Sequence, residues 1–527
     1  MIKVLVSDPL AKEGIEILER EKDIEVVVKT KQTPAQLKEE IKGYDAIVVR
    51  SATKVTKEVI EASDKLRVIG RAGVGLDNVD IEAASKKGIV VVNAPAGNTI
   101  STAEHTMSLI LSLSRNITKA DRSIKNGEWD RKKFMGVELY GKVLGIAGMG
   151  RIGAEVAKRA LSFRMKVIAY DPFLSAEKAK KIGIELSSFE NLLKTSDYIT
   201  VHTPLTEDTR YMISDEQFKL MKTGVRVVNC ARGGIIEEKA LKKAIESGKV
   251  AGCALDVFES EPPKDFSLVK MDNVVATPHL GASTEEAQVN VAIDIAEIVL
   301  DVLMNRCIRN AVNVPCVDTE LLKTLRPYLD LAEKLGSLGT QLVEGHIKNV
   351  KIKYTGEITS YDTSPLTIAI IKGMLAPILQ ETVNFVNAPM IAKEREIKVS
   401  ETKTAEIEDF ANLISIEIET DKAKLNVEGT LFTKVDPRIA KIGGFYVDAS
   451  PTGYMLVISN KDMPGIIGEI GTLIGKNKIN IAGMSFGREA PGGKAITVLN
   501  VDSVVPKDVL AQIKSAKNIF DAKLVRL

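Results

Sequence analysis

Three polar side chains between residues 232 and 279 have the chemistry that hydride transfer between an alcohol and a ketone requires. His279 can accept the hydroxyl proton as the hydride leaves carbon, because an imidazole with a pKa of about 6.5 changes charge around neutral pH. Glu261 can hydrogen-bond the far nitrogen of that ring and stabilise the imidazolium. Arg232 offers a planar fork of donors that suits a carboxylate and can polarise a carbonyl oxygen. This set predicts a 2-hydroxy acid as substrate.

Each of these residues also has a simpler explanation when it is taken alone. A lone histidine at the end of a strand is more often structural than catalytic, and an arginine after "NCA" could serve an ion pair. The three follow separate apolar runs of β type: "VRVVNC", "GCALDVF" and "NVVATPH". In an open α/β sheet, ligands bind outside the carboxyl ends of the strands. The joint occurrence therefore favours catalysis.

The stretch "GMGRIG" matches a dinucleotide fingerprint and lies between the apolar run "KVLGIAG" and a helical pattern. Gly148 permits the tight turn, Gly150 lets the backbone approach a pyrophosphate, and Gly153 allows close packing of helix and strand. Asp171 follows about twenty residues later, where a carboxylate binds ribose hydroxyls and repels the extra phosphate of NADP. The alternative is a tight turn without a ligand. The context predicts NAD binding.

Two further arginines, Arg50 and Arg71, end apolar runs in the N-terminal part of the chain. A 2-hydroxy acid needs one arginine for its carboxylate, so two more cations indicate a second anion such as a phosphate. The alternative is that both arginines form surface ion pairs.

The elements that must position these residues are two doubly wound units. Five β-type runs alternate with helical patterns up to about residue 95, and a second series begins at "KVLGIAG". "STAEHTMSLILSLSRNITKADRSIKNG" predicts one long helix between them, opened by a capping box of Ser101 and Glu104. The helical stretch from "STEEAQ" is expected to return the chain to the first unit.

The last third of the chain has a different order of predicted strands and helices. Residues 316–450 mix helices with strands such as "LISIEIET" and predict an α+β domain, whereas residues 452–527 follow the ferredoxin-like order βαββαβ. The predicted fold class is thus α/β, with two Rossmann-like parallel-sheet domains, an intervening α+β domain and a ferredoxin-like domain.

The bulk composition agrees with a multidomain enzyme. The chain has 527 residues, 45% of them hydrophobic, and its 72 Lys and Arg nearly balance 70 Asp and Glu. We expect no nucleic-acid partner and no membrane partner, because there is no long basic tract and no long apolar run. The N-terminus "MIKVLVSDP" lacks the pattern of a signal segment, which with the lack of a long apolar run predicts a cytoplasmic location. Four cysteines without metal-ligand spacing predict reduced thiols and no metal: Cys230, Cys253, Cys307 and Cys316.

Residues 1–315 resemble the D-isomer-specific 2-hydroxyacid dehydrogenases, through "GMGRIG", "HTPLTEDTR", "NCARGGIIEEKAL", "ALDVFESEPP" and "TPHLGAST". The resemblance implies a substrate-binding domain of residues 1–97 and 295–315, an NAD-binding domain of residues 98–294, and an active site in the cleft. It implies catalytic roles for Arg232, Glu261 and His279. It also implies cofactor contacts, beyond the glycines and catalytic residues named above, by Val74, Arg151, Ile152, Asp171, Thr203, Cys230, Ala231, Asp256, Gly281 and Ala282.

The strings "VVRSATKV", "IGRAGVGLDNVD", "GNTISTAEHT" and "WDRKKF" are most similar to members of that family that oxidise 3-phospho-D-glycerate in the phosphorylated route to L-serine. The similarity implies that Arg50, Arg71 and Asn98 bind substrate. One of Arg131, Lys132 and Lys133 is expected at the phosphate, from the same or a neighbouring subunit. The alternatives are a hydroxypyruvate, glyoxylate or lactate-type reductase and a non-catalytic NAD-sensing protein.

The C-terminal domain, with "NKDMPGIIGEIG" and "INIAG", resembles ACT domains, which bind amino acids, often at subunit interfaces. The region before it resembles the intervening domain of long-form members. Asp462 and Asn480 match polar positions of a serine site, whereas Asn460 departs from the larger ring-bearing residue of some relatives. The resemblance implies L-serine as effector and a homo-oligomer, a dimer or tetramer. The alternative is a purely structural dimerisation module.

Overall fold

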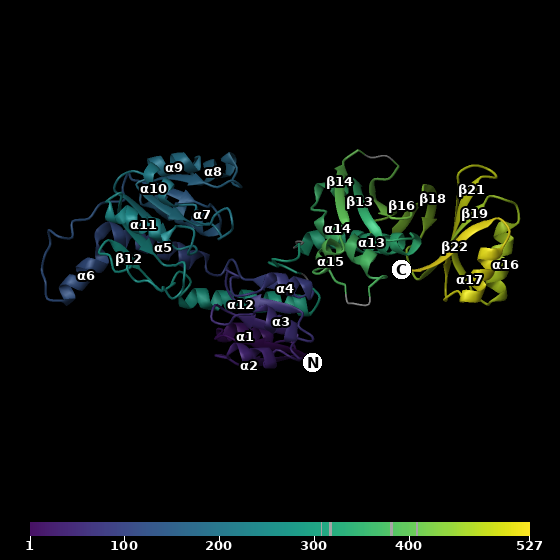
Figure 1. Ribbon diagram of the computed structural model, residues 1–527, viewed down its shortest axis with the longest axis horizontal. Coiled ribbons are helices and arrows are strands. Elements are labelled where there is room, and N and C mark those ends of the chain that lie inside the picture. The colour runs from purple at the N-terminus through teal and green to yellow at the C-terminus, as the bar shows by residue number, and fades with distance from the viewer. Residues whose placement is uncertain (307, 316–318, 380–382, 407–408) are drawn as a thin grey trace.

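The computed structural model describes residues 1–527 except 307, 316–318, 380–382 and 407–408. Figure 1 shows its units following one another along the longest axis, with the ferredoxin-like unit at one end and helix α6 at the other. Cys307 and Cys316, and with them the start of the predicted intervening domain, lie outside the described residues. No helix of the described part is both long and apolar enough to cross a membrane.

The first sheet has five parallel strands in the order β2-β1-β3-β4-β5. They are β1 (Ile2–Val6), β2 (Ile24–Val28), β3 (Ala46–Val49), β4 (Val68–Arg71) and β5 (Val90–Asn93). The helices are α1 (Lys12–Leu18), α2 (Pro34–Glu40), α3 (Lys57–Ala62) and α4 (Ile81–Lys86). One face packs against α1 and the later helix α12, and the other packs against α2, α3 and α4. Burial on both faces explains the continuous Val and Ile runs of the strands.

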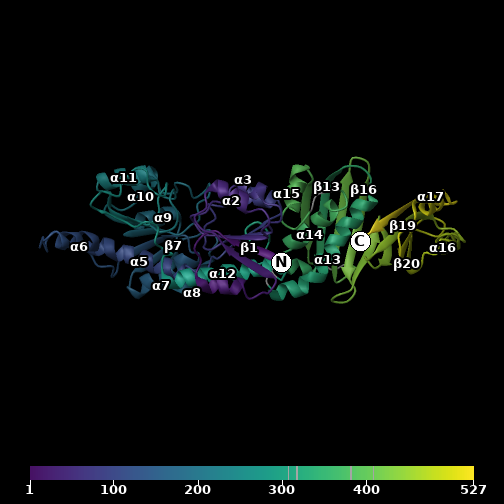
Figure 2. The same ribbon diagram turned by 90° about the horizontal axis from the view of Figure 1, so that it is seen from below.

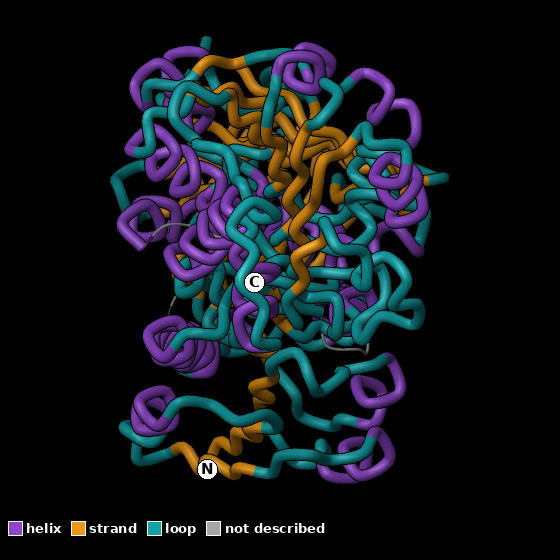
Figure 3. Tube along the Cα trace, turned by 90° about the vertical axis from the view of Figure 1, so that its left-hand side faces the viewer, coloured by secondary structure: helices purple, strands orange, loops and turns teal. Residues whose placement is uncertain are grey.

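The second sheet has seven parallel strands in the order β12-β11-β10-β9-β6-β7-β8. They are β6 (Val143–Ala147), β7 (Lys166–Tyr170), β8 (Glu185–Leu186), β9 (Tyr198–Val201), β10 (Val225–Asn229), β11 (Val250–Leu255) and β12 (Val274–Ala276). Its helices are α7 (Arg151–Ser162), α8 (Ala176–Ile182), α9 (Phe189–Thr195), α10 (Asp215–Leu220) and α11 (Glu238–Glu246). Figure 3, which looks along the long axis, shows strands between layers of helices. The α/β fold class is confirmed.

Two helices connect the sheets: α5 (Thr99–Arg115) and α12 (Glu285–Leu303). Helix α5 covers the second sheet beside α7, and α12 packs into the core of the first sheet through Val291, Ile295 and Val299. Figure 2 shows α12 running beneath the first unit. The chain therefore crosses between the units twice, through α5 and α12.

The prediction of one long helix opened by Ser101 is wrong. The stretch forms two helices, α5 and α6 (Ile117–Lys125). Asn116 separates them in the left-handed conformation at φ 54°, which Asn tolerates better than most residues. The Ser101 hydroxyl donates to the Asn98 carbonyl within the first turn, so the helix starts earlier than the capping box predicted. The Glu104 carboxylate instead pairs with Arg159 at 3.2 Å.

The intervening domain has a mixed six-stranded sheet in the order β14-β13-β15-β16-β17-β18. Its strands are β13 (Ile347–Gly356), β14 (Lys398–Thr404), β15 (Asn412–Thr420), β16 (Lys424–Leu431), β17 (Pro437–Ile442) and β18 (Phe445–Ala449). Its α-helices are α13 (Thr319–Leu342), α14 (Ser364–Leu375) and α15 (Ala388–Glu394). The sequence did not predict β14, β17 and β18. Strand β14 lies at the sheet edge with mostly exposed side chains, so it lacks an apolar alternation.

The ferredoxin-like domain has an antiparallel sheet in the order β20-β21-β19-β22. It consists of β19 (Tyr454–Lys461), α16 (Ile466–Lys476), β20 (Ile481–Arg488), β21 (Lys494–Val501), α17 (Lys507–Ser515) and β22 (Ile519–Arg526), which confirms the predicted order. Helices α16 and α17 cover one face. Met455, Val498 and Val525 on the other face share a core with Leu335 of α13. This domain and the intervening domain therefore pack as one body.

Candidate active site

The sheet brings the predicted catalytic residues to one edge. Strands β10, β11 and β12 are parallel neighbours, with Asn229 opposite Leu255 and Leu255 opposite Ala276. The chain leaves all three strands at the same level, so the segments after them lie side by side. These segments carry Arg232, Asp256, Glu261 and His279.

His279 and Glu261 form a direct pair. The Nδ1 atom of His279 lies 2.7 Å from Glu261 Oε2, and Glu261 Oε1 accepts a hydrogen bond from the Phe258 backbone N–H at 3.1 Å. The bond to Glu261 raises the pKa of His279. Burial acts to raise the pKa of Glu261, but the bond to His279, the charge of that ring and the Phe258 N–H together outweigh it and hold that pKa below its usual range. The carboxylate thus fixes Nδ1 as the N–H nitrogen and leaves Nε2 as the proton acceptor.

Asp256 organises the backbone around His279. Its side chain is 1% exposed, and its two oxygens accept the backbone N–H groups of Leu280 at 2.7 Å and Gly281 at 2.9 Å. The His279 N–H donates to the Asp256 carbonyl, and His279 takes a left-handed φ of 54°. The carboxylate is thereby engaged by protein groups. Its predicted contact with the cofactor stays a prediction.

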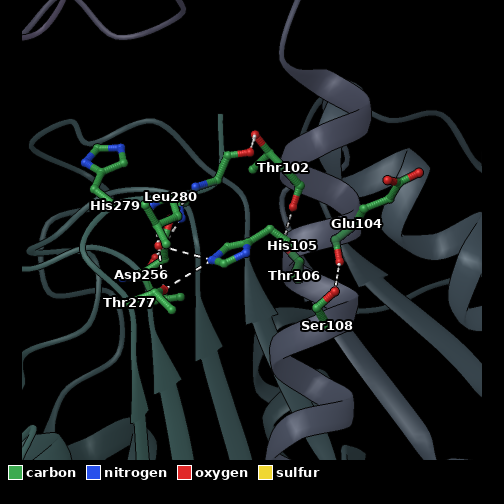
Figure 4. Close-up of polar contacts among 12 residues, drawn as sticks. Thr102, Glu104, His105, Thr106, Ser108, Asp256, Thr277, His279 and Leu280 are labelled. Atoms are coloured by element: carbon green, nitrogen blue, oxygen red, sulfur yellow. Dashed lines mark hydrogen bonds and ion pairs between the residues drawn. The ribbon is translucent and has the colours of Figure 1, made fainter. Parts of the chain in front are cut away.

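Sequence reasoning missed His105, which lies on α5. Its Nε2 atom is 3.2 Å from both Asp256 Oδ1 and Thr277 Oγ1, as Figure 4 shows. On the same helix, the Thr102 hydroxyl donates to the Gly281 carbonyl at 3.1 Å. The rarity of histidine, four in 527 residues, was the one signal in the sequence that pointed to His105.

The three arginines come close enough together to affect one another. Burial, and then the neighbouring Arg232, lowers the pKa of Arg71 to about 10, and Arg50 adds to the same effect. The Nε atom of Arg71 is buried and has no hydrogen-bond partner among the described residues. Arg232 Nε lies 3.4 Å from Asp77 Oδ2 at the mouth of the cluster. A half-buried group of cations with free donors has the chemistry of an anion site.

The fingerprint has the geometry that a dinucleotide needs. Gly148 has φ 98°, and a Cβ on Gly153 would lie 2.1 Å from the Gly148 carbonyl oxygen, so neither position suits a side chain. A Cβ on Gly150, the N-cap of α7, would meet nothing within 4 Å. Asp171 accepts the backbone N–H of Met149 at 2.7 Å and of Phe173 at 2.8 Å, which orients its carboxylate beside the glycine turn. These residues fit NAD.

The remaining predicted site residues also follow strands. Asn98 is the N-cap of α5, and its Oδ1 is buried without a partner among the described residues. Burial raises the pKa of the Cys230 thiol to about 12, so this cysteine is a thiol and no nucleophile. The other predicted cofactor positions follow β4, β6, β9, β10 and β12: Val74, Arg151, Ile152, Thr203, Ala231, Gly281 and Ala282. Their roles stay predictions.

Two groups of predicted site residues lie away from the His279–Glu261 pair. Arg131, Lys132 and Lys133 are exposed in the segment after α6, which Figures 1 and 2 place at the end of the molecule remote from the first sheet.

The predicted effector residues lie in the ferredoxin-like domain and bond to protein groups there. Asn460 is buried and accepts from the Thr497 hydroxyl at 3.0 Å. Asp462 pairs with Arg488 at 3.1 Å, and the Asn480 amide donates to Asp502 at 2.7 Å.

Three family models match the chain. They are the NAD binding domain of the D-isomer specific 2-hydroxyacid dehydrogenases over residues 107–281, the D-3-phosphoglycerate dehydrogenase intervening domain over residues 324–443, and the ACT domain over residues 454–518. The second domain is thus an NAD-binding domain, and the ferredoxin-like domain is an ACT domain.

Curated relatives match this sequence along the whole chain. The chain is 48% identical to a D-3-phosphoglycerate dehydrogenase of Methanocaldococcus jannaschii and 45% identical to one of Bacillus subtilis, and each match covers 100% of both chains. Among solved structures it is similar to a D-lactate dehydrogenase from Aquifex aeolicus, complexed with NAD and lactic acid. That match has 31% identity and a TM-score of 0.53, and covers 59% of this chain and 96% of that one. The chain therefore belongs to the D-3-phosphoglycerate dehydrogenases, within the D-isomer-specific 2-hydroxyacid dehydrogenase family.

Proposed function

We propose that the protein oxidises 3-phospho-D-glycerate to 3-phosphooxypyruvate with NAD, the first step of the phosphorylated route to L-serine. The observation that carries this proposal is the cluster of Arg50, Arg71 and Arg232 beside the His279–Glu261 pair. One guanidinium suffices for the carboxylate of a hydroxy acid, and the others suit a phosphate. The full-length relatives named D-3-phosphoglycerate dehydrogenase support the same substrate.

The chain's own residues account for the proton and the charges of the reaction. NAD bound at the glycine turn supplies the hydride acceptor. Its proposed site is lined by residues that follow the strands: Val74, Arg151, Ile152, Asp171, Thr203, Cys230, Ala231, Asp256, Gly281 and Ala282. His279 Nε2 takes the hydroxyl proton, while Glu261 stabilises the imidazolium that forms. Arg232 holds the carboxylate and polarises the developing carbonyl. Arg50, Arg71 and Asn98 hold the rest of the substrate.

Further parts of the proposal concern regulation and assembly. The ACT domain binds L-serine near Asn460, Asp462 and Asn480, and the protein forms a homo-oligomer. One of Arg131, Lys132 and Lys133 reaches the phosphate from a neighbouring subunit, because the segment that carries them points away from its own first sheet. Residues 1–97 with 295–315 form the substrate domain, residues 98–294 the NAD-binding domain, 316–450 the intervening domain and 452–527 the ACT domain.

An NAD-reduction assay tests the proposed activity directly. The protein should turn over 3-phospho-D-glycerate at least about a hundredfold more efficiently than D-glycerate, D-lactate or glycolate, because only the phosphorylated acid carries the second anion that the arginine cluster suits. His279→Ala should lower kcat at least about a hundredfold while NADH still binds. His346→Ala, at an exposed histidine of the intervening domain, is the control. Near-normal turnover by His279→Ala, or equal efficiency with unphosphorylated acids, would contradict the proposal.

The effector is tested separately in the same assay. L-serine should lower turnover by the wild type, and calorimetry should detect its binding. Asp462→Ala should weaken both effects without changing turnover in the absence of serine. Full activity at saturating L-serine with no detectable heat of binding would contradict this part of the proposal. It would not affect the catalytic part.

A further inference from the structure

We propose that His105 is a positioning residue for the reaction, which fixes the segment from Thr277 to Gly281 against helix α5 and so holds His279 in place. The inference rests on the proposed role of His279 as proton acceptor. His105 does not touch the catalytic ring itself. Figure 4 shows its imidazole reaching from α5 to Asp256, with His279 on the other side of that residue.

The buried carboxylate of Asp256 is the centre of this arrangement. It accepts the N–H groups of Leu280 and Gly281, directly after His279, while its own carbonyl accepts the N–H of His279. Any rotation of the carboxylate would therefore disturb the backbone that carries the catalytic ring. Burial acts to raise the pKa of Asp256, but hydrogen bonds from His105, Thr277 and the two amides outweigh it and lower that pKa. The Asp256 carboxylate is therefore ionised although it is buried, and its hydrogen-bond donors stabilise that charge.

The hydrogen-bond pattern assigns the proton of His105. The Thr277 hydroxyl donates to Asp256 Oδ1 at 2.6 Å, so its lone pairs face His105. Both groups near His105 Nε2 are then acceptors, and Nε2 must carry the hydrogen and share it between them. A glutamine amide can place an N–H at nearly the same point, whereas leucine places none there.

Helix α5 connects the segment that carries His279 to the proposed substrate site. Thr102, one turn before His105, donates to the Gly281 carbonyl, so two successive turns of α5 hold the catalytic segment. The same helix has Asn98, a proposed substrate residue, as its N-cap. Asn98 and His279 are therefore fixed relative to each other, while Arg50 and Arg71 belong to the first sheet. The contact therefore holds the proton acceptor in place relative to Asn98, the proposed substrate residue on the same helix.

Substitution of His105 should slow the chemical step selectively. His105→Leu should lower kcat about 10- to 100-fold, because small misplacements of a catalytic group have effects of this size. The KM for 3-phospho-D-glycerate and the Kd for NADH should stay within about threefold, since no contact to either is lost. The isotope effect on kcat with substrate deuterated at C2 should rise, because hydride transfer becomes rate-limiting. His105→Gln should recover most of the rate.

The control is Ser108→Ala, an exposed position on the same helix whose hydroxyl bonds only within α5. Thr277→Val leaves His105 unchanged but removes both its second acceptor and one donor to Asp256. It should therefore slow the chemical step as well, which covers the case that His105→Leu does not fold. The inference is overturned if His105→Leu or Thr277→Val lowers the melting temperature while kcat and the isotope effect stay at wild-type values, or if His105→Gln is as slow as His105→Leu. A normal rate for His279→Ala would instead remove the proposed mechanism itself.

Discussion

His279 and Glu261 depend on each other for their charge states. The folded-state pKa of His279 is raised, so its contribution to stability is fully present below the unfolded value of about 6.5 and is lost as the pH rises through the folded value. The folded-state pKa of Glu261 is lowered, so its contribution is present above about 4.3 and is lost as the pH falls through the folded value. The pair stabilises the fold most between these limits. Oxidation, however, needs the neutral imidazole, which prevails above that window.

Glu261→Gln should shift the pH dependence of the reaction. The substitution removes the negative charge that raises the pKa of His279, so the acid limb of kcat/KM for oxidation should move to lower pH. The plateau rate should fall about 10- to 100-fold, since glutamine no longer stabilises the imidazolium. The measurement is a pH profile of NAD reduction for both proteins. Glu259→Gln is the control, because Glu259 bonds to Tyr211 and the Glu238 amide instead of His279. An acid limb that stays in place would show that His279 is not the titrating base.

At the scale of elements, the turn between β6 and α7 contains one glycine that packing requires and another that the proposed cofactor requires. A Cβ at Gly153 would lie against the Gly148 carbonyl, so strand and helix would have to move apart. A Cβ at Gly150 would meet open space in the protein, although the proposed pyrophosphate approaches there. Two glycines three residues apart thus serve different purposes.

The pair Gly153→Ala and Gly150→Ala should display this difference. Gly153→Ala should destabilise the protein by about 1–3 kcal/mol, the usual cost of forcing an extra carbon into a packed site. Gly150→Ala should keep the wild-type melting temperature and weaken NADH binding at least about tenfold, equivalent to about 1.4 kcal/mol. Thermal unfolding without cofactor and NADH titration measure the two quantities. Loss of stability in Gly150→Ala, or unchanged stability in Gly153→Ala, would contradict this division.

At the scale of the whole molecule, the intervening domain contacts the unit of the first sheet through the segment before α15 and through α15 itself, where Glu394 pairs with Lys86 of α4 at 3.7 Å. Val386 is 5% exposed and belongs to the core of the first sheet, together with Val4 and Val299. The Asn384 amide donates to the Gly88 carbonyl at 2.9 Å, after helix α4. This contact connects the body that contains the ACT domain to the unit that carries Arg50 and Arg71.

Val386→Asp should release this docking. An unpaired carboxylate in the core of the first sheet costs several kcal/mol, so the undocked state should become populated. Limited proteolysis between the two bodies should then be at least about tenfold faster, and small-angle scattering should show a larger radius of gyration. Val435→Asp, at a valine of the same domain that is 73% exposed, is the control. Equal cleavage of both variants would mean that Val386 does not hold the domains together.

The sequence by itself determined the features that depend on local pattern and on the rules of parallel sheets. Alternating β-type and helical runs predicted both doubly wound units, and strand order then brought Arg232, Glu261 and His279 to one edge. Only the tertiary structure decided which residues support them. His105 and Asp256 are 151 residues apart, and no periodicity connects them. The same holds for the burial of Arg71, the edge strand β14 and the docking of Val386. These features depend on which surfaces pack together, and packing is a property of the whole chain that local residue spacing does not contain.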